Sequence, residues 1–447
     1  MEGLVMTAQI ILSLSILVGL HEGGHLLAAK AFGMRVEQFS IGFPPKLFSF
    51  KWGETEYALS AIPLGGFVKI SGMIDESLDT EAMKEPPKEY EFRAKPAWQR
   101  LIVMLGGIIV NVITGVIIFI SLTYIFGDTY ISKDAVNAKG GIVAYELAEE
   151  IGLKTGDKIV KINGQEFDDF QDLIDGKVFL ADDAYYTVER DGKLVDVQIP
   201  GNFIENLNDE DAMARFIFPR FASVVGKVGE NTLAERVGIT EGDRILEISG
   251  TKVAFQDEVI KKLKGYDQDS IHLKVQRGDE ILTFNEYFKN DTIIGYIPAL
   301  DFDESTINYD LGQSITIGTQ RAFGIVFLQI KAFGKMFSGE LSVTKSLSGP
   351  IGIAKAYGGT WDWQRFWRMT GLLSMVLAFM NLLPIPALDG GHVMFLSYEI
   401  ISGKKPSDGF LESAQKVGMV FLLLLMVFII FNDIFKIEFI KDLFGLN

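Results

Sequence analysis

Long apolar runs alternate with polar stretches along the 447 residues of this chain. Four runs reach the length of roughly 20 residues that a helix needs to cross the hydrocarbon core of a bilayer. Their apolar cores occupy residues 4–32, 101–126, 369–388 and 417–435. The pattern therefore predicts a polytopic α-helical membrane protein with about four transmembrane helices.

The segment between the first two predicted spans, residues 34–100, has a different pattern. It contains short apolar stretches that are typical of β-strands, and turn residues separate them. The stretches are residues 39–41, 47–50, 57–59 and 67–70, and the turns contain Pro44-Pro45, Gly53 and Gly65-Gly66. We therefore predict β-hairpins close to the membrane surface.

A repeat marks the polar part of the chain between residues 128 and 300. Residues 149–164, EEIGLKTGDKIVKING, recur as residues 235–250, ERVGITEGDRILEISG. Both copies resemble the strand–turn–strand passage of PDZ domains, which implies two α+β modules over residues 128–218 and 219–300. PDZ domains bind an extended peptide at a sheet edge, so we expect substrate sensing or gating, with inert spacing as the alternative.

Residues 323–336 have apolar positions at helical spacing, with Lys331 and Lys335 to one side. This pattern predicts an amphipathic helix lying on the membrane surface. A short buried helix packed against the second PDZ-like module is an equally good interpretation.

The charges narrow the possible partners and the topology. A net charge of −16 argues against nucleic acid, because phosphate binding needs clustered Lys and Arg. Basic residues follow the first span, and Lys404, Lys405 and Lys416 lie between the third and fourth spans, so the positive-inside rule places both loops in the cytoplasm. The repeated modules and both termini are then expected on the opposite side. The chain has no cysteine, so a metal has only nitrogen and oxygen ligands.

The candidate chemistry lies at the end of the first span, in His21-Glu22-Gly23-Gly24-His25. Two histidines four residues apart on a helix lie one turn apart, so both can bind one metal ion. The glutamate between them is placed to act as general base toward a water molecule that the metal activates. Ionisable residues inside a membrane are costly and by default functional, which indicates hydrolysis within the bilayer.

A metal held by two histidines needs a further protein ligand and an open position for water. Asp389 is the candidate, because Pro384 and Pro386 break the third span before it and such a break is tolerated where it lines a cavity. The alternative is that His21, His25 and Asp389 form a buried polar cluster that only stabilises helix packing.

Three more polar residues each leave two interpretations open. Asn381 either makes an interhelical hydrogen bond or contacts the reacting groups, and Asn111 either packs between helices or faces the substrate. His392 is an alternative metal ligand, although we expect it to face the cytoplasmic interface.

The H-E-G-G-H sequence at residues 21–25, the N-x-x-P-x-P-x-L-D-G motif at residues 381–390 and the PDZ-like pair together resemble the site-2 protease family of intramembrane zinc metalloproteases. The chain looks most like the bacterial regulator-of-sigma-E protease type, which has tandem PDZ domains. Residues 348–353, SGPIGI, extend the resemblance, and residues 63–69, PLGGFVK, are similar to the family's membrane-re-entrant β-loop region.

The resemblance implies a zinc metalloendopeptidase with His21, His25 and Asp389 as Zn²⁺ ligands, Glu22 as catalytic base and Asn381 in substrate binding. It implies regulated intramembrane proteolysis of single-span transmembrane proteins, such as an anti-sigma factor after site-1 cleavage, or cleavage of remnant signal peptides. The implied location is the bacterial cytoplasmic (inner) membrane, with the PDZ domains outside the cytoplasm and in reach of peptide segments.

The competing hypothesis is a PDZ-based membrane scaffold with a structural or inactive metal site. The predicted organisation is a first span with the zinc motif (1–33), a cytoplasmic or membrane-re-entrant β region (34–100), a second span (101–126), two PDZ-like domains (128–218 and 219–300), a linker with the amphipathic surface helix (301–367), a third span with the aspartate ligand (368–390), a cytoplasmic loop (391–416), a fourth span (417–436) and a tail (437–447).

Overall fold

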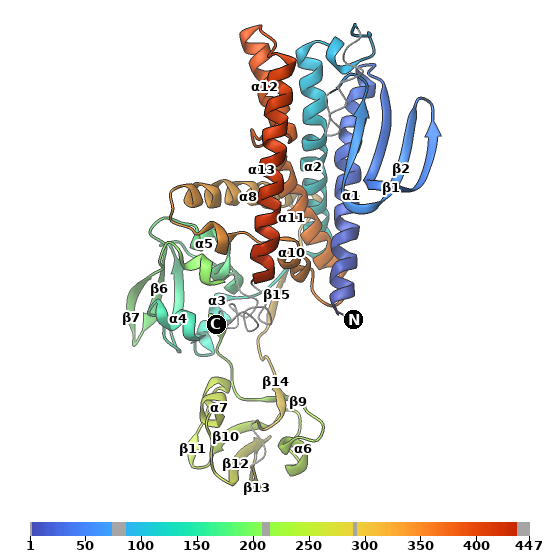
Figure 1. The fold of residues 1–447 in the computed structure, drawn as a ribbon. Coiled ribbons are helices and arrows are strands. Elements are labelled where there is room, and N and C mark those ends of the chain that lie inside the picture. The colour runs from blue at the N-terminus through green and yellow to red at the C-terminus, as the bar shows by residue number, and fades with distance from the viewer. Residues whose placement is uncertain (1, 74–85, 208–214, 289–292, 436–447) are drawn as a thin grey trace. The chain divides into compact units, whose positions relative to one another are not determined.

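The computed structural model describes residues 2–73, 86–207, 215–288 and 293–435 (Figure 1). Contacts within the chain divide it into two units. A helical unit consists of residues 1–127, 308–336 and 342–447, and an α+β unit consists of residues 128–307 and 337–341. The candidate metal-binding residues belong to the helical unit, and the sequence repeat belongs to the α+β unit.

The helical unit contains three helices of the described residues that are long and apolar enough to cross a membrane, namely α1, α2 and α13. This finding confirms a membrane protein with several candidate spans. The helices of the unit are α1 (Glu2–Ala31), α2 (Ala97–Phe126), α8 (Leu311–Phe337), α9 (Val343–Ser346), α10 (Pro350–Ala356), α11 (Trp363–Leu382), α12 (Asp389–Ser402) and α13 (Asp408–Phe435), with a 3-10 turn at Phe92–Ala94.

The third predicted span forms α11, which has 20 residues but is not among the three sufficiently apolar helices. Arg365 and Arg368 in its first turns lower its mean hydropathy. The helix ends at Leu382, so the break expected from the following prolines is confirmed. Most of α12 lies where the sequence analysis expected a loop; Leu396 on this helix is buried in an apolar cluster that includes Val103 of α2.

Small residues let α2 approach α1 and α11 closely. A β-carbon at Gly24 of α1 would lie 2.3 Å from the carbonyl oxygen of Gly106 in α2, so the packing leaves no room for a side chain there. Further along α2, a β-carbon at Gly115 would lie 2.5 Å from the sulfur of Met375 in α11. Gly24 and Gly115 thus mark the points of closest approach of α2 to its two neighbouring helices.

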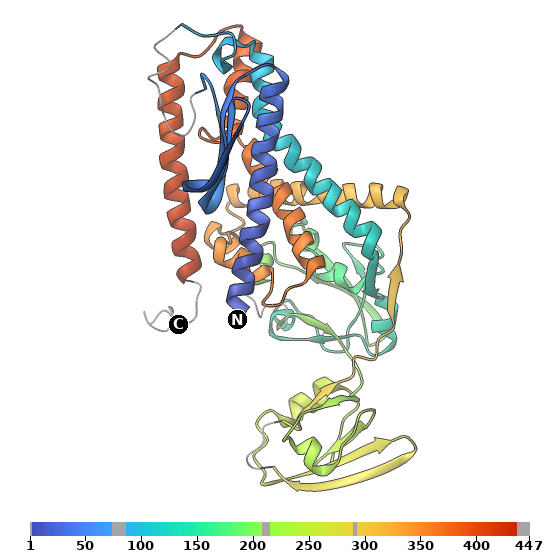
Figure 2. The same cartoon turned by 90° about the vertical axis from the view of Figure 1, so that its right-hand side faces the viewer.

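The predicted β region is one long antiparallel hairpin of β1 (Val36–Trp52) and β2 (Thr55–Ile70). Both strands bend, and residues 38–41 of β1 pair on one side with residues 66–69 and on the other with residues 56–59. Residues 66–68 therefore lie at an edge of this sheet, with no second strand beside them among the described residues. The hairpin lies beside α1 (Figure 2) and shares a buried cluster with Ala29 of that helix.

The amphipathic segment forms α8, which is longer than predicted and packs within the helical unit. Gly318 lies against the backbone of Ile120 in α2, and Ala322 is buried with Phe119 and Met375. The interpretation as a short helix packed against the second repeated module is therefore wrong.

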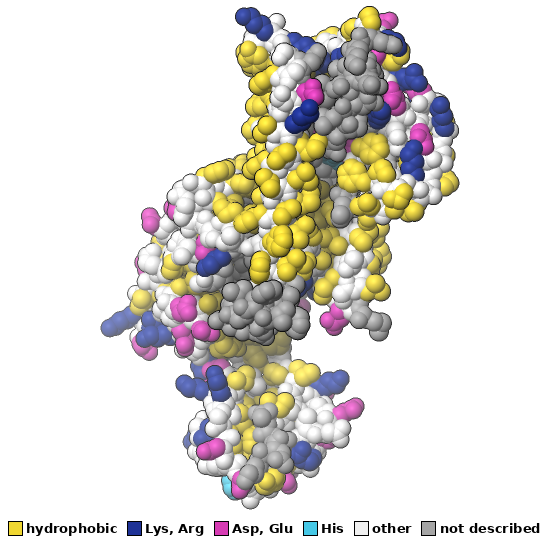
Figure 3. Space-filling view, in the orientation of Figure 1, with side chains coloured by type: hydrophobic (Ala, Val, Ile, Leu, Met, Phe, Trp, Pro, Cys, Tyr) yellow, Lys and Arg dark blue, Asp and Glu magenta, His cyan; other side chains and the backbone are white. Residues whose placement is uncertain are grey.

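Large apolar side chains are exposed on the helical unit. Figure 3 shows them as a nearly continuous yellow surface over α13, where they include Val417, Phe421, Leu424 and Phe431. Soluble proteins rarely expose an apolar patch of this extent, so this face of α13 is suited to contact with lipid.

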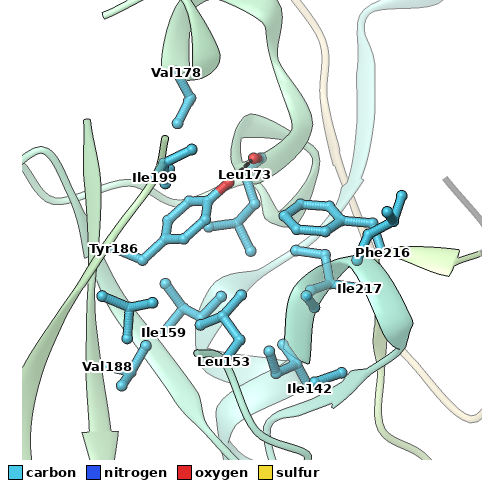
Figure 4. Close-up of a cluster of buried hydrophobic side chains, with 14 of the residues drawn as sticks. Ile142, Leu153, Ile159, Leu173, Val178, Tyr186, Val188, Ile199, Phe216 and Ile217 are labelled. Carbon is cyan, nitrogen blue, oxygen red and sulfur yellow. Dashed lines mark hydrogen bonds between the residues drawn. The ribbon is translucent and has the colours of Figure 1, made fainter. Parts of the chain in front are cut away.

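The α+β unit begins with a module that has its own apolar core. Figure 4 shows this core around Tyr186, whose hydroxyl donates a hydrogen bond to the carbonyl oxygen of Leu173. The module contains β3 (Asp128–Ile131), α3 (Lys133–Ala138), β4 (Ile142–Ala144), α4 (Glu146–Glu150), β5 (Lys158–Ile162), a 3-10 turn (Phe170–Ile174), α5 (Gly176–Phe179), β6 (Tyr185–Arg190), β7 (Lys193–Gln198), a second 3-10 turn (Phe203–Leu207) and β8 (Ile217–Pro219).

The second module has a separate core and a four-stranded sheet in the order β11-β10-β12-β13. It contains β9 (Val225–Val228), α6 (Leu233–Val237), β10 (Arg244–Ile248), β11 (Thr251–Lys252), α7 (Gln256–Leu263), β12 (Ser270–Arg277), β13 (Glu280–Tyr287) and β14 (Tyr296–Pro298). The chain then returns to the first module, because β15 (Glu304–Ile307) pairs with β3. This strand lies within residues 301–367, which are predicted as a linker.

Candidate metal centre

Three of the predicted site residues meet between α1 and the start of α12. The Nε2 atoms of His21 and His25 are 3.2 Å apart on successive turns of α1. The Oδ2 atom of Asp389 is 3.1 Å from Nε2 of His21 and 3.3 Å from Nε2 of His25. One ligand atom from each residue thus lies within 4.8 Å of the other two.

The irregular segment between the end of α11 and the start of α12 brings Asp389 to this position. Ala387 has a left-handed backbone with φ of 78°, and α12 starts two residues later at Asp389. The next two residues have no room for side chains, since a β-carbon at Gly390 would lie 2.1 Å from the carbonyl oxygen of Leu383 and one at Gly391 would lie 2.7 Å from that of Ile385. The Gly-Gly pair therefore lets α12 fold back closely against the broken segment.

The three side chains fit a divalent metal. Oδ2 of Asp389 is buried and accepts no hydrogen bond from the described residues, although two imidazole nitrogens lie next to it. Three electron-pair donors that face one another in a buried site are favourable when a cation lies among them. Two imidazole nitrogens and one carboxylate oxygen are a donor set that zinc accepts, with a further position left for water.

Helix α2 contacts both histidines. Nδ1 of His25 donates to the carbonyl oxygen of Val103 at 2.8 Å, and the side-chain amide of Asn111 lies 3.2 Å from Nδ1 of His21. A β-carbon at Gly107 would lie 2.5 Å from Cε1 of His21 and from Nε2 of His25. Sequence reasoning missed Val103 and Gly107; the adjacent glycines at 106 and 107 in an apolar helix were the available signal.

A cavity of about 680 Å³ surrounds these groups. Glu22 lines it from α1 and lies near β2, where a β-carbon at Gly66 would be 3.3 Å from Cγ of Glu22. Asn381, in the last turn of α11, has its Nδ2 atom 3.3 Å from Nε2 of His21. The cavity therefore holds all five predicted site residues together with the edge of the β1–β2 hairpin.

His392 lines the same cavity but does not belong to the cluster of His21, His25 and Asp389. Its Nε2 atom lies 2.9 Å from the side-chain amide nitrogen of Gln415 in α13. The structure thus directs this imidazole toward α13 rather than toward the His21–His25 pair.

A cluster of two histidines and an aspartate, with a glutamate in the same cavity and apolar helices around it, is typical of a metallohydrolase built into a membrane protein. The comparison with known proteins agrees, because residues 9–425 match Peptidase family M50. The chain belongs to this peptidase family. The predicted family and the predicted metalloprotease activity are thereby confirmed.

Three relatives match almost the whole chain. The regulator of sigma E protease of Haemophilus influenzae is 29% identical, with 96% of this chain and 98% of the relative covered. The regulator of sigma-E protease RseP of Escherichia coli K12 is 28% identical, with 95% and 97% covered. A Pasteurella multocida protein whose name assigns it to the zinc metalloproteases is also 28% identical, with 96% and 98% covered.

Proposed function

We propose that this protein is an intramembrane zinc metalloprotease that cleaves the transmembrane segments of single-span membrane proteins. The observation that carries the proposal is the convergence of two Nε2 atoms and one carboxylate oxygen in a cavity among apolar helices. His21, His25 and Asp389 hold the metal, Glu22 is the catalytic base and Asn381 binds the substrate. The names of relatives support zinc as the metal.

The residues divide the chemical work as follows. When bound, the zinc ion supplies a Lewis acid that acidifies water and polarises the scissile carbonyl. Glu22 accepts a proton from the attacking water and later gives it to the nitrogen of the leaving amine. Asn381 donates an amide hydrogen to the carbonyl oxygen, where negative charge develops in the transition state.

A helical substrate hides its carbonyl groups in hydrogen bonds, so it must unwind before attack. Residues 66–68 of β2 lie at an edge of the sheet and line the cavity together with Glu22. An extended substrate segment adds to this edge as a further strand, which presents its carbonyl groups to the site.

The topology follows from the charge pattern. α11 is the third of four spans. Its polar first turns lie at the membrane interface, where arginine side chains are stable. The β1–β2 hairpin and α12 lie toward the cytoplasm, and the two repeated modules lie outside it, in the inner membrane of a bacterium. α8 lies along the membrane surface with its exposed apolar side chains in the lipid.

The two modules of the α+β unit act as tandem PDZ domains that exclude proteins with bulky extracytoplasmic domains. The substrate is then a membrane protein already trimmed by another protease, such as an anti-sigma factor, or a remnant signal peptide. The names of the Haemophilus influenzae and Escherichia coli relatives support the anti-sigma factor as the first candidate.

The test compares Glu22→Gln with the parent in the full-length protein, using zinc content and cleavage of a single-span reporter in lipid vesicles. The variant should keep about one zinc ion per chain and lose cleavage, whereas His21→Ala should lose both. Cleavage by Glu22→Gln would rule out the role of Glu22. A zinc-free, inactive parent protein would instead support the scaffold hypothesis.

A further inference from the structure

Helix α2 presents three residues at a spacing of four to the histidine pair of α1. Val103, Gly107 and Asn111 lie one turn apart, so they share one face of the helix. Gly107 lets the two imidazoles approach that face, and the residues one turn before and after it each contact one imidazole. The second ring nitrogen of each histidine therefore faces α2.

The arrangement at His25 fixes which ring nitrogen carries the proton. A carbonyl oxygen only accepts, so Nδ1 of His25 must donate to Val103, which leaves the lone pair of Nε2 free for a metal. A metal-binding histidine ordinarily has such an acceptor for its other nitrogen, because the hydrogen bond fixes both tautomer and ring orientation.

His21 needs an equivalent acceptor, since its Nε2 atom is the one that faces Asp389. The nearest group to its Nδ1 atom is the side-chain amide of Asn111, with Nδ2 at 3.2 Å. The Oδ1 atom of the same amide is buried and has no hydrogen-bond partner among the described residues. A half-turn of the amide exchanges these two atoms and brings the unpartnered oxygen to Nδ1.

We propose that Asn111 is a positioning residue whose Oδ1 atom accepts the Nδ1 proton of His21 and so directs the Nε2 lone pair toward the metal. The proposal rests on the proposed function, in which His21 is a metal ligand. It also explains a side chain that is only 1% exposed and whose oxygen is otherwise unsatisfied.

Helix packing does not account for this side chain. The contact between Asn111 and α11 uses the backbone carbonyl oxygen, which accepts a hydrogen bond from the Ser374 hydroxyl at 2.7 Å. Any residue at position 111 would offer the same carbonyl group. Substitution of Ser374 by alanine therefore removes the packing contact and leaves the proposed acceptor in place.

The test measures the zinc dissociation constant of the full-length protein by competition with a chelator. Asn111→Leu keeps the branching at Cγ but is larger and has no acceptor, and it should bind zinc about 10- to 100-fold more weakly. Asn111→Asp keeps an acceptor and should bind zinc within about threefold of the parent, as should Ser374→Ala. Asn111→Ala serves as the acceptor-free variant if the leucine variant does not fold, as judged by thermal unfolding without zinc.

Equal zinc affinity in the acceptor-free variant and the parent would overturn the proposal, and so would a loss in Asn111→Asp as large as that in Asn111→Leu. His21→Ala separates this failure from a failure of the proposed function. If His21→Ala releases zinc while Asn111→Leu retains it, only the role of Asn111 is wrong. If His21→Ala retains zinc, the metal site itself has been misassigned.

Discussion

Gly107 of α2 lies so close to His21 of α1 that a β-carbon on Gly107 would be 2.5 Å from Cε1 of the imidazole. That distance is far below van der Waals contact, and the same β-carbon would be 2.5 Å from Nε2 of His25. The absence of a side chain at one position of α2 thus sets where both imidazoles lie.

Replacement of Gly107 by alanine should displace both histidines. We expect Gly107→Ala to lose zinc affinity by about 10-fold or more, since ligands shifted by a methyl group no longer converge. Zinc content after gel filtration, together with reporter cleavage, measures the effect. Gly324→Ala is a matched control in α8, because its β-carbon would meet no described atom within 4 Å. Full zinc content in Gly107→Ala would contradict the prediction.

The two glycines inside the H-E-G-G-H motif should respond differently to alanine. A β-carbon at Gly24 would lie 2.3 Å from the carbonyl oxygen of Gly106, whereas one at Gly23 would meet no described atom within 4 Å. Gly24→Ala should therefore push α1 and α2 apart and lower the free energy of unfolding by about 1–3 kcal/mol. Gly23→Ala should unfold at the parent's temperature or slightly above it, because alanine favours the helix. Equal thermal midpoints for both variants would show that α1 and α2 do not pack in this way.

Local sequence was sufficient to predict three ligand candidates and Glu22 as the candidate catalytic base. The spacing of His21 and His25 places both on one helix face whatever the rest of the fold, and Pro384 and Pro386 must end a helix before Asp389. Span length likewise follows from apolar runs alone. These features depend on residues that are neighbours in sequence, so no tertiary information was needed.

The residues that support the histidines could not be predicted, because their identity depends on which helices pack together. A single sequence does not show which helices do so. Val103 acts through a backbone carbonyl group that every residue carries, so no residue type reveals it. The strand β15 pairs with β3, although the whole second module lies between them in the sequence. Local patterning cannot indicate such a distant pairing. α12 has two glycines in its first turn, which disfavour a helix in isolation, and it forms because it packs against the broken segment and α2.

Each of the two repeated modules contains an equivalent aspartate–arginine ion pair, and the pair in the second module gives a prediction about the pH dependence of stability. Asp243 binds Arg277 through both carboxylate oxygens, as Asp157 binds Arg190 in the first module. Burial raises the pKa of Asp243, but the hydrogen bonds from Arg277 and from the backbone of Thr240 outweigh it and hold this pKa below its usual value. A carboxyl group with a lowered pKa in the folded state stabilises the fold above its unfolded pKa of about 4 and loses this contribution as the pH falls further.

The second module should therefore lose stability as the pH falls below about 4, and Asp243→Asn should be less sensitive to that fall. Hydrogen exchange in the full-length protein, expressed as protection factors for β10 and β12 between pH 6 and 3, measures it. The first module serves as an internal reference within each sample. A parent and a variant that lose protection in parallel would show that the ion pair does not carry the pH dependence.

Asp433, in the last turns of α13, binds the start of α10, and this contact should stabilise the position of α13. Its carboxylate accepts hydrogen bonds from the backbone nitrogens of Gly349 at 2.8 Å and Ile351 at 2.9 Å, with Gly352 at 3.3 Å. Asp433→Ala leaves these buried donors unpaired, so we expect a loss of about 2 kcal/mol in the free energy of unfolding. Asp433→Asn keeps one acceptor oxygen and should lose about half as much. Thermal unfolding in detergent compares the two, and an alanine variant as stable as the parent would mean that α13 is held by its apolar contacts alone.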